Sequence, residues 1–319
     1  MDPNPAIARY RPFPHRLAQV VAVLTWPLLI LGGLVTTLKV GMAVPDWPTT
    51  FGVNMFLYDF FNDSLGVQLE HTHRLDASLV GLACIALTVT MLVADRRGWA
   101  KGMGVLALVL VIVQGVLGGT RVTQNSQSLA AVHGASGQLF FAFLATLCVW
   151  TGRGWIEAGE PRPDTYRLRN RAVAAFGMLA LTVILGVVVR HFGSHMAIGG
   201  HMLLAILVLG HALALTIKIG KVKAEVPELV PSSRALAISI VIQVGLGIAA
   251  VVALWPLDPA RVQYDAVRLL IRTGHQANGA LVLASSAVLA LRAYRGLSAT
   301  PAVSEAPARA GSSPIEVYS

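Results

Sequence analysis

The stretch EHTHRLDASLVGLACIALTVTMLVA, from Glu70 to Ala94, combines the two features that decide the fold. It opens with a group of ionisable residues that includes Glu70, His73 and Arg74, and it continues as a long apolar run. A transmembrane helix needs about 20 mostly apolar residues. The segment 73–94 is therefore predicted to span a membrane, with its polar end at one face.

Seven further segments pass the same test, roughly 17–38, 102–120, 130–150, 172–190, 197–218, 234–254 and 275–293. The chain is 55% hydrophobic and only 13% charged, whereas a soluble domain is nearer a quarter charged. This composition excludes a disordered chain and a coiled coil. The high sequence pI, about 10.1, does not indicate nucleic-acid binding, because basic loops between the spans account for it. We expect an all-α polytopic membrane protein with eight transmembrane helices in a lipid bilayer.

The basic residues predict the orientation of the spans. With the N-terminus inside, eighteen of the 25 Lys and Arg residues fall in inside segments and seven fall outside. Cytoplasmic loops carry such an excess of basic residues. We therefore expect a multi-pass protein of the cell (inner) membrane with both termini in the cytoplasm.

The chain repeats weakly along its length. Odd-numbered spans end in similar stretches, LGGLVTTLK, LGGTRV, LGVVVRH and LGIAAVV, and each following span opens with a histidine: His73, His133, His201 and His275. Repeats of this kind are common in membrane proteins. They predict two four-helix bundles related by a pseudo-twofold axis, residues 1–155 and 172–295. A basic cytoplasmic linker, 156–171, would join them, and 296–319 would be a disordered tail.

The four histidines predict two haem sites. A polar residue inside a bilayer is costly and usually faces the bundle interior. Neutral imidazoles on facing helices can bind one porphyrin iron from both sides, which favours pairing within halves: His73 with His133, and His201 with His275. Small residues beside them would admit a flat macrocycle or serve only helix packing: Gly134, Gly137, Gly199, Gly200, Gly274 and Gly279.

Other metal sites fit less well. The two cysteines, Cys84 and Cys148, lie inside apolar runs, and the chain has no HExxH motif, which argues against a zinc or iron–sulfur centre. The remaining histidines lack repeat partners and are expected to be non-ligands: His15, His71, His191, His195 and His211.

Each charged residue near the histidines has two possible roles. Arginines could pair with haem propionates or reach lipid headgroups: Arg74, Arg121, Arg190 and Arg272. Glu70 stands three residues before His73, so it could shuttle protons beside a haem or favour the helix dipole. The segment 39–69 could form a lid or an interfacial aromatic belt.

The Glu-x-x-His-Arg motif of Glu70, His73 and Arg74, the GMAVPDWPTT stretch after the first span, and the three later histidines together resemble the haem A synthase family. The resemblance extends from about residue 15 to 295. Because Cys84 and Cys148 lie inside spans, the chain is most similar to the branch that lacks a cysteine pair in an outer loop.

The resemblance implies a membrane oxidoreductase that oxidises the C8 methyl group of haem O to a formyl group by successive hydroxylations, for cytochrome c oxidase biogenesis. It implies substrate haem between His73 and His133 with Arg74, a haem b cofactor ligated by His201 and His275, and Glu70 as the catalytic carboxylate. Propionate contacts would fall to Arg121, Arg190 and Arg272. A haem O synthase (farnesyltransferase) is the expected substrate donor, and the electron donor is not identified. The alternatives are a dihaem b-type electron carrier and a haem transporter or chaperone.

Overall fold

The computed structural model describes residues 10–253 and 266–298. Within them, eight helices are long and apolar enough to cross a membrane, which confirms the predicted all-α polytopic fold. They are α1 (Pro12–Thr37), α2 (Leu65–Ala94), α3 (Gly98–Thr123), α4 (Gln127–Thr151), α6 (Leu168–Phe192), α7 (His195–Lys221), α8 (Val230–Ala253) and α9 (Ala266–Gly296). A short helix, α5 (Arg153–Ile156), follows α4, and a 3₁₀ turn, η1 (Pro227–Leu229), precedes α8.

Two helices begin well before the boundary that hydropathy predicted. Helix α2 begins at Leu65 rather than 73, and α9 begins at Ala266 rather than 275. The early turns carry polar residues, which lower hydropathy without breaking the backbone hydrogen bonds of a helix. As a consequence, His73 and His275 lie about two turns inside their helices.

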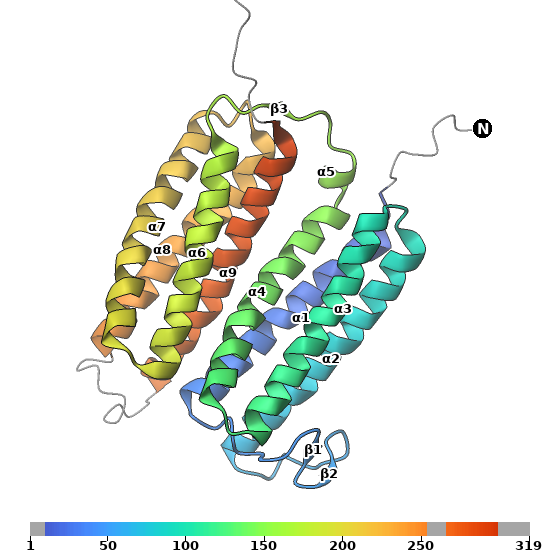
Figure 1. Cartoon of the computed structure of the whole chain (residues 1–319), viewed down its shortest axis with the longest axis vertical. Helices are drawn as coiled ribbons and strands as arrows, with labels where there is room; N and C mark the ends of the chain where they lie inside the picture. Colours follow the sequence, from blue (N-terminus) through green and yellow to red (C-terminus); the bar gives the residue numbers. More distant parts are fainter. Residues whose placement is uncertain (1–9, 254–265, 299–319) are drawn as a thin grey trace, which may run out of the picture.

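The helices form two groups of four (Figure 1). In the N-terminal group, α1 and α3 each pack against α2 and α4, and in the C-terminal group, α6 and α8 each pack against α7 and α9. Helix α9 joins the groups by packing against α1 and α4. The predicted division into a substrate half and a cofactor half, and the pseudo-twofold relation between them, stay predictions.

Each group has its own apolar core. Leu87, Met91 and Leu144 are fully buried in the N-terminal group, and Leu215, Leu236 and Leu283 in the C-terminal group. Apolar side chains on the outward faces are exposed, because lipid tails solvate them as well as protein does. The free Cys84 belongs to the first core, which agrees with its place in an apolar run.

A β-hairpin stands at one end of the N-terminal group. Strands β1 (Thr49–Thr50) and β2 (Val53–Asn54) pair antiparallel around a turn at Phe51 and Gly52, whose φ angles of 51° and 77° are both positive. Asp46 holds this turn by accepting hydrogen bonds from Thr49 Oγ1 at 2.5 Å and from the N–H groups of Phe51 and Gly52 at 2.8 Å each. Partial burial raises the pKa of Asp46, but the hydrogen bonds outweigh it and lower the pKa to about 2.

At the opposite end, the connection between the groups meets the end of α9. Strand β3 (Arg162–Pro163) pairs in parallel with β4 (Leu297–Ser298), so the first residues of the predicted tail are structured. The rest of that tail, 299–319, lies outside the described residues. Asp164 accepts from the N–H groups of Leu168 and Arg169 and so caps α6.

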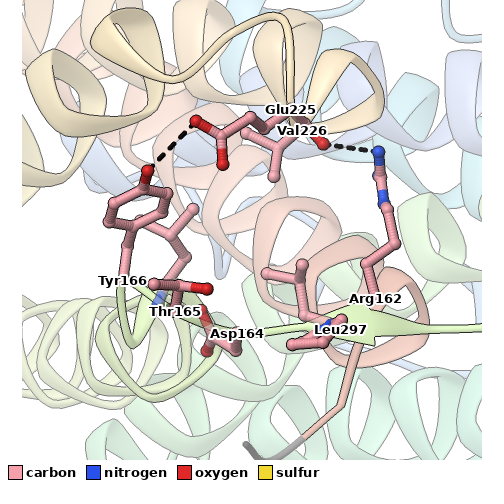
Figure 2. A pocket seen from close by; sticks show the side chains of 9 residues that line it. Arg162, Asp164, Thr165, Tyr166, Glu225, Val226 and Leu297 are labelled. Atoms are coloured by element: carbon pink, nitrogen blue, oxygen red, sulfur yellow. Dashed lines mark hydrogen bonds between the residues drawn. The ribbon is translucent and has the colours of Figure 1, made fainter.

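Figure 2 shows the pocket that this pairing leaves open, with the Tyr166 hydroxyl donating to Glu225 and Arg162 donating to the Glu225 carbonyl group. It lies at the end of the molecule away from the β1–β2 hairpin (Figure 1). The pocket is therefore remote from the turns of α2 and α4 that carry His73 and His133.

We expect Leu87→Ala to lower stability by about 2–5 kcal/mol, because it removes a fully buried side chain from the N-terminal core. The measurement is thermal unfolding in detergent micelles. Leu82→Ala on the same helix is the control, since Leu82 is 64% exposed and should leave the melting temperature unchanged. Equal effects of the two variants would contradict the described orientation of α2.

The hairpin should depend on ionised Asp46. Its pKa is depressed on folding, so its stabilising effect is present above the unfolded pKa near 3.8 and is lost as pH falls through about 2. Amide-exchange protection at Phe51 and Gly52 should therefore be constant from neutral pH to about 4. Asp46→Asn should lower it already at neutral pH, and protection that falls near pH 6 would refute this account.

Candidate haem-binding sites

Each helix group brings two of the predicted histidines face to face. The ring centres of His73 on α2 and His133 on α4 are 6.5 Å apart, with an interplanar angle of 87°. Those of His201 on α7 and His275 on α9 are 6.3 Å apart, at 73°. In each group the two helices are diagonal neighbours, because each packs mainly against the other two helices. The structure thus brings together the two pairs that the sequence predicted.

The spacing fits two axial ligands of one metal ion. A histidine nitrogen lies about 2 Å from a transition metal that it binds, and the ring centre roughly 1 Å further, so two axial imidazoles have centres about 6 Å apart. Both observed separations agree with this value. The rings thus fit the iron of a haem, the group that sequence analysis predicted for them.

Each imidazole rests on a glycine of the preceding helix. A Cβ atom on the glycine would lie 3.1–3.3 Å from the ring Cε1 atom in all four cases: Gly32 with His73, Gly118 with His133, Gly186 with His201, and Gly247 with His275. Any larger residue would therefore displace the ring. The glycines predicted to lie against the haem were instead those next to the histidines in the sequence. The signal for the correct ones was the Leu-Gly pair that recurs in the four quoted stretches.

The inner nitrogen of each ring faces a backbone carbonyl group. His201 Nδ1 lies 2.9 Å from the Thr182 carbonyl oxygen, four residues before Gly186. For the other rings, the carbonyl group four residues before the contacting glycine belongs to Leu28 near His73, to Gln114 near His133 and to Gln243 near His275. Nδ1 of His73, His133 and His275 is buried without a hydrogen bond of good geometry in the described residues. An Nδ1–H aimed at a carbonyl group leaves the Nε2 lone pair for a metal.

A polar pair recurs beside the second histidine of each group. The Gln114 amide donates to Ser136 Oγ at 2.7 Å, and the Asn278 amide donates to Gln243 Oε1 at 2.8 Å. Gln114 and Gln243 each lie four residues before the glycine that contacts a histidine ring, Gly118 or Gly247. Their partners, Ser136 and Asn278, each lie three residues after that histidine. This correspondence between α3–α4 and α8–α9 supports the predicted internal repeat.

Glu70 and Arg74 form a buried ion pair that holds the segment between α1 and α2. Arg74 Nη2 donates to Glu70 Oε1 at 2.9 Å, and the two side chains are 9% and 1% exposed. Glu70 Oε2 accepts from the N–H group of Val44 at 3.0 Å. The other Arg74 bonds go to carbonyl oxygens of Val44, Asp46 and Thr49, at 2.8, 2.7 and 3.1 Å.

These bonds engage all four N–H groups of the two terminal nitrogens of Arg74. Only Nε–H is left for another acceptor. A propionate contact of Arg74 therefore stays a prediction that would need this last donor or the release of a loop carbonyl group.

The other predicted arginines lie near the rings. Arg121 is half-buried near His73 and His133, with Nη1 3.4 Å from the Gly41 carbonyl oxygen. Arg190 reaches from α6 to α1, donating to the Gly33 carbonyl oxygen at 2.8 Å and to Thr37 Oγ1 at 2.6 Å. Arg272 lies three residues before His275 on α9. Their role toward propionates stays a prediction.

Helix α1 is the wall between the two histidine pairs. Gly32 faces His73, while its neighbour Gly33 faces α9, where a Cβ atom would overlap the Gln276 side chain. Gln276 directly follows His275 and donates to the Leu29 carbonyl oxygen at 3.2 Å. Two adjacent glycines thus bring both sites close to one turn of one helix.

The histidines expected to be non-ligands have other partners where the structure shows one. His71 is fully buried and lies 3.1 Å from Thr50 Oγ1, so it ties α2 to the β-hairpin. His15 faces Thr151 Oγ1, and His211 faces the Arg171 carbonyl oxygen.

Comparison with known proteins gives a partial but consistent match. The family described as cytochrome oxidase assembly protein matches residues 64–200. This range contains Glu70, His73, Arg74 and His133, and it ends one residue before His201. The match therefore covers the N-terminal histidine pair and not the C-terminal one.

Three relatives point the same way. The chain is 28% identical over 176 residues to a haem A synthase of Exiguobacterium sp., covering 54% of this chain and 56% of that protein. It is 31% identical over 180 residues to the haem A synthase of Exiguobacterium sibiricum, covering 54% and 58%. It is also 33% identical over 144 residues to a protoheme IX farnesyltransferase of Haloarcula marismortui, covering 45% and 29%.

The matched part spans little more than half the length of the two synthases and less than a third of the farnesyltransferase. The family match nevertheless includes the helices that carry the Glu-x-x-His-Arg motif and the first imidazole pair. Over this part of its length the chain is similar to the cytochrome oxidase assembly family and to two haem A synthases.

Proposed function

We propose that this chain is a haem A synthase, which oxidises the C8 methyl group of haem O to a formyl group by successive hydroxylations for cytochrome c oxidase biogenesis. The observation that carries the proposal is the occurrence of two imidazole pairs with axial-ligand spacing, one in each helix group. Two haem sites are what an enzyme needs if one haem is the substrate and another is a resident cofactor.

We assign the substrate to the N-terminal group and haem b to the C-terminal group. Haem b, when bound, supplies a one-electron redox centre. His201 and His275 would hold it, and His73 and His133 would hold haem O. The two groups differ in a way that supports this assignment, because a carboxylate, Glu70, lies three residues before His73 and an apolar residue, Ile198, lies at the matching place before His201.

The residues around the N-terminal pair would bind and orient the substrate. Gly32 and Gly118 would fix the positions of the two rings. Arg121, beside both rings, is the candidate donor to a propionate. Glu70 is the proposed catalytic carboxylate. Its two oxygens accept hydrogen bonds from Val44 and Arg74, so these contacts would orient the carboxylate, and a free lone pair on each oxygen could still take up a proton.

We also propose the cellular setting. The excess of basic residues at the ends away from the β1–β2 hairpin supports an orientation with both termini in the cytoplasm and the histidine pairs toward the outer side of the cell membrane. An apolar substrate such as haem O favours direct transfer from the farnesyltransferase that makes it. The electron donor is a separate protein or small molecule.

Expression beside a haem O synthase, followed by haem extraction and mass analysis, tests the activity. We expect haem A and its alcohol precursor. A dihaem electron carrier or a haem transporter would return only unmodified haem. Product made equally well by a variant without His73 would also contradict the assignment.

Single histidine variants test the division between the groups. His275→Ala should deplete haem b, seen as a loss of its absorption bands, because one axial ligand is gone. His73→Ala should retain haem b and lose haem A formation. If His73→Ala removes haem b instead, the two groups have the opposite roles.

Glu70→Gln tests the carboxylate. It keeps the size of the side chain and an acceptor for Arg74, so the fold and the haem b spectrum should be retained while haem A formation is lost. Haem extraction and the absorption spectrum measure the two outcomes. Unchanged product would remove Glu70 from the reaction.

A further inference from the structure

Trp47, in the segment between α1 and α2, lies flat against helix α3. A Cβ atom added to Gly119 would overlap the Cδ2 atom of the Trp47 indole and clash with its neighbouring ring atoms. Gly119 is buried and has no side chain, so the indole reaches the helix backbone. The contact is therefore specific to glycine at this position.

The contact is next to the N-terminal histidine pair. Gly119 directly follows Gly118, on which the His133 ring rests. Two residues further on, Arg121 lies beside both His73 and His133 and reaches back to Gly41, in the same segment as the indole. Trp47 is thus held at the hairpin end of the N-terminal group, at the depth of its imidazoles.

The backbone on either side of Trp47 is fixed. The carbonyl groups of Val44, Asp46 and Thr49 accept hydrogen bonds from the buried Arg74 guanidinium. Glu70 binds the N–H group of Val44, and Asp46 closes the hairpin turn. These bonds hold the backbone before and after Trp47, and so they keep the attachment point of the indole next to Gly119.

In the described residues of the C-terminal group, no glycine corresponds to Gly119. The Leu-Gly pairs of α1 and α3 are followed by a second glycine, whereas those of α6 and α8 are followed by Val187 and Ile248. In the N-terminal group both second glycines receive a side chain from another segment, Gln276 on Gly33 and Trp47 on Gly119. A branched side chain at those positions would exclude an indole.

We propose that Trp47, seated on Gly119, is a positioning residue of the His73–His133 site that closes its outer, water-facing side. It restricts that site, and not the His201–His275 site, to exchange of its haem through the lipid-facing side. The proposal rests on the proposed function only in taking the His73–His133 pair to hold a haem.

The test is the rate at which haem leaves the N-terminal site. His275→Ala protein, loaded with protohaem so that the His73–His133 pair holds it, is mixed with excess apomyoglobin, which takes up released haem. Trp47→Ala and Gly119→Ala should each speed release roughly tenfold, the order expected when an aromatic contact no longer excludes water. Because they remove the same contact, the double variant should be no faster than either one.

Gly115→Ala is the matched control on the same helix, because a Cβ atom there meets nothing within 4 Å, and it should release haem at the unmodified rate. Gly119→Ala in a His73→Ala background should leave release from the His201–His275 site unchanged, which also shows that the chain is folded. Trp47→Phe replaces Trp47→Ala if the latter does not fold, and the smaller ring should give intermediate release.

Release at the unmodified rate from both Trp47 and Gly119 variants would overturn the proposal, as would an equal effect of Gly115→Ala. Failure of the His275→Ala protein to bind protohaem would overturn the haem pair itself, and with it this proposal. Absence of haem A product, with release altered as expected, would contradict the proposed function and leave the role of Trp47 standing.

Discussion

The packing of an imidazole on a glycine, across two adjacent helices, is the constraint on which the rest of this structure depends. It occurs four times, at a Cε1 approach of 3.1–3.3 Å to the position of the missing Cβ atom. A glycine allows the helix backbone to approach the ring, and the helix in turn offers the ring nitrogen a carbonyl group. Ring position is thus set by backbone, which holds its geometry better than a flexible side chain would.

The packing of side chains on adjacent glycines also explains why the two histidine pairs lie on either side of helix α1. Adjacent residues of a helix point about 100° apart. Gly32 can therefore face His73 while Gly33 faces Gln276, next to His275. Helix α1 belongs to the N-terminal group and is also packed on α9. Two haems held in this way would share one helix as their common wall, which suits transfer of electrons from one to the other.

The ionisable motif that first suggested chemistry has a second use. Glu70, Arg74 and His71 all bind the segment between α1 and α2, through Val44, Asp46, Thr49 and Thr50. Their burial costs less than isolated charges would, because each charged group has hydrogen-bonded partners. Resemblance predicted that Glu70 and Arg74 touch substrate. The structure adds that they also fix the chain that brings Trp47 to Gly119.

The sequence alone determined the eight spans, because hydropathy is a local property of the chain, and its repeat spacing predicted two halves and two histidine pairs. It could not show which glycine meets which ring, since His133 and Gly118 are brought together only by packing of α4 on α3. Nor could it show that the Arg74 guanidinium donates its hydrogen bonds to carbonyl groups about thirty residues earlier. Contacts between distant segments depend on how helices pack and on where the α1–α2 segment lies, and only the tertiary structure decides these.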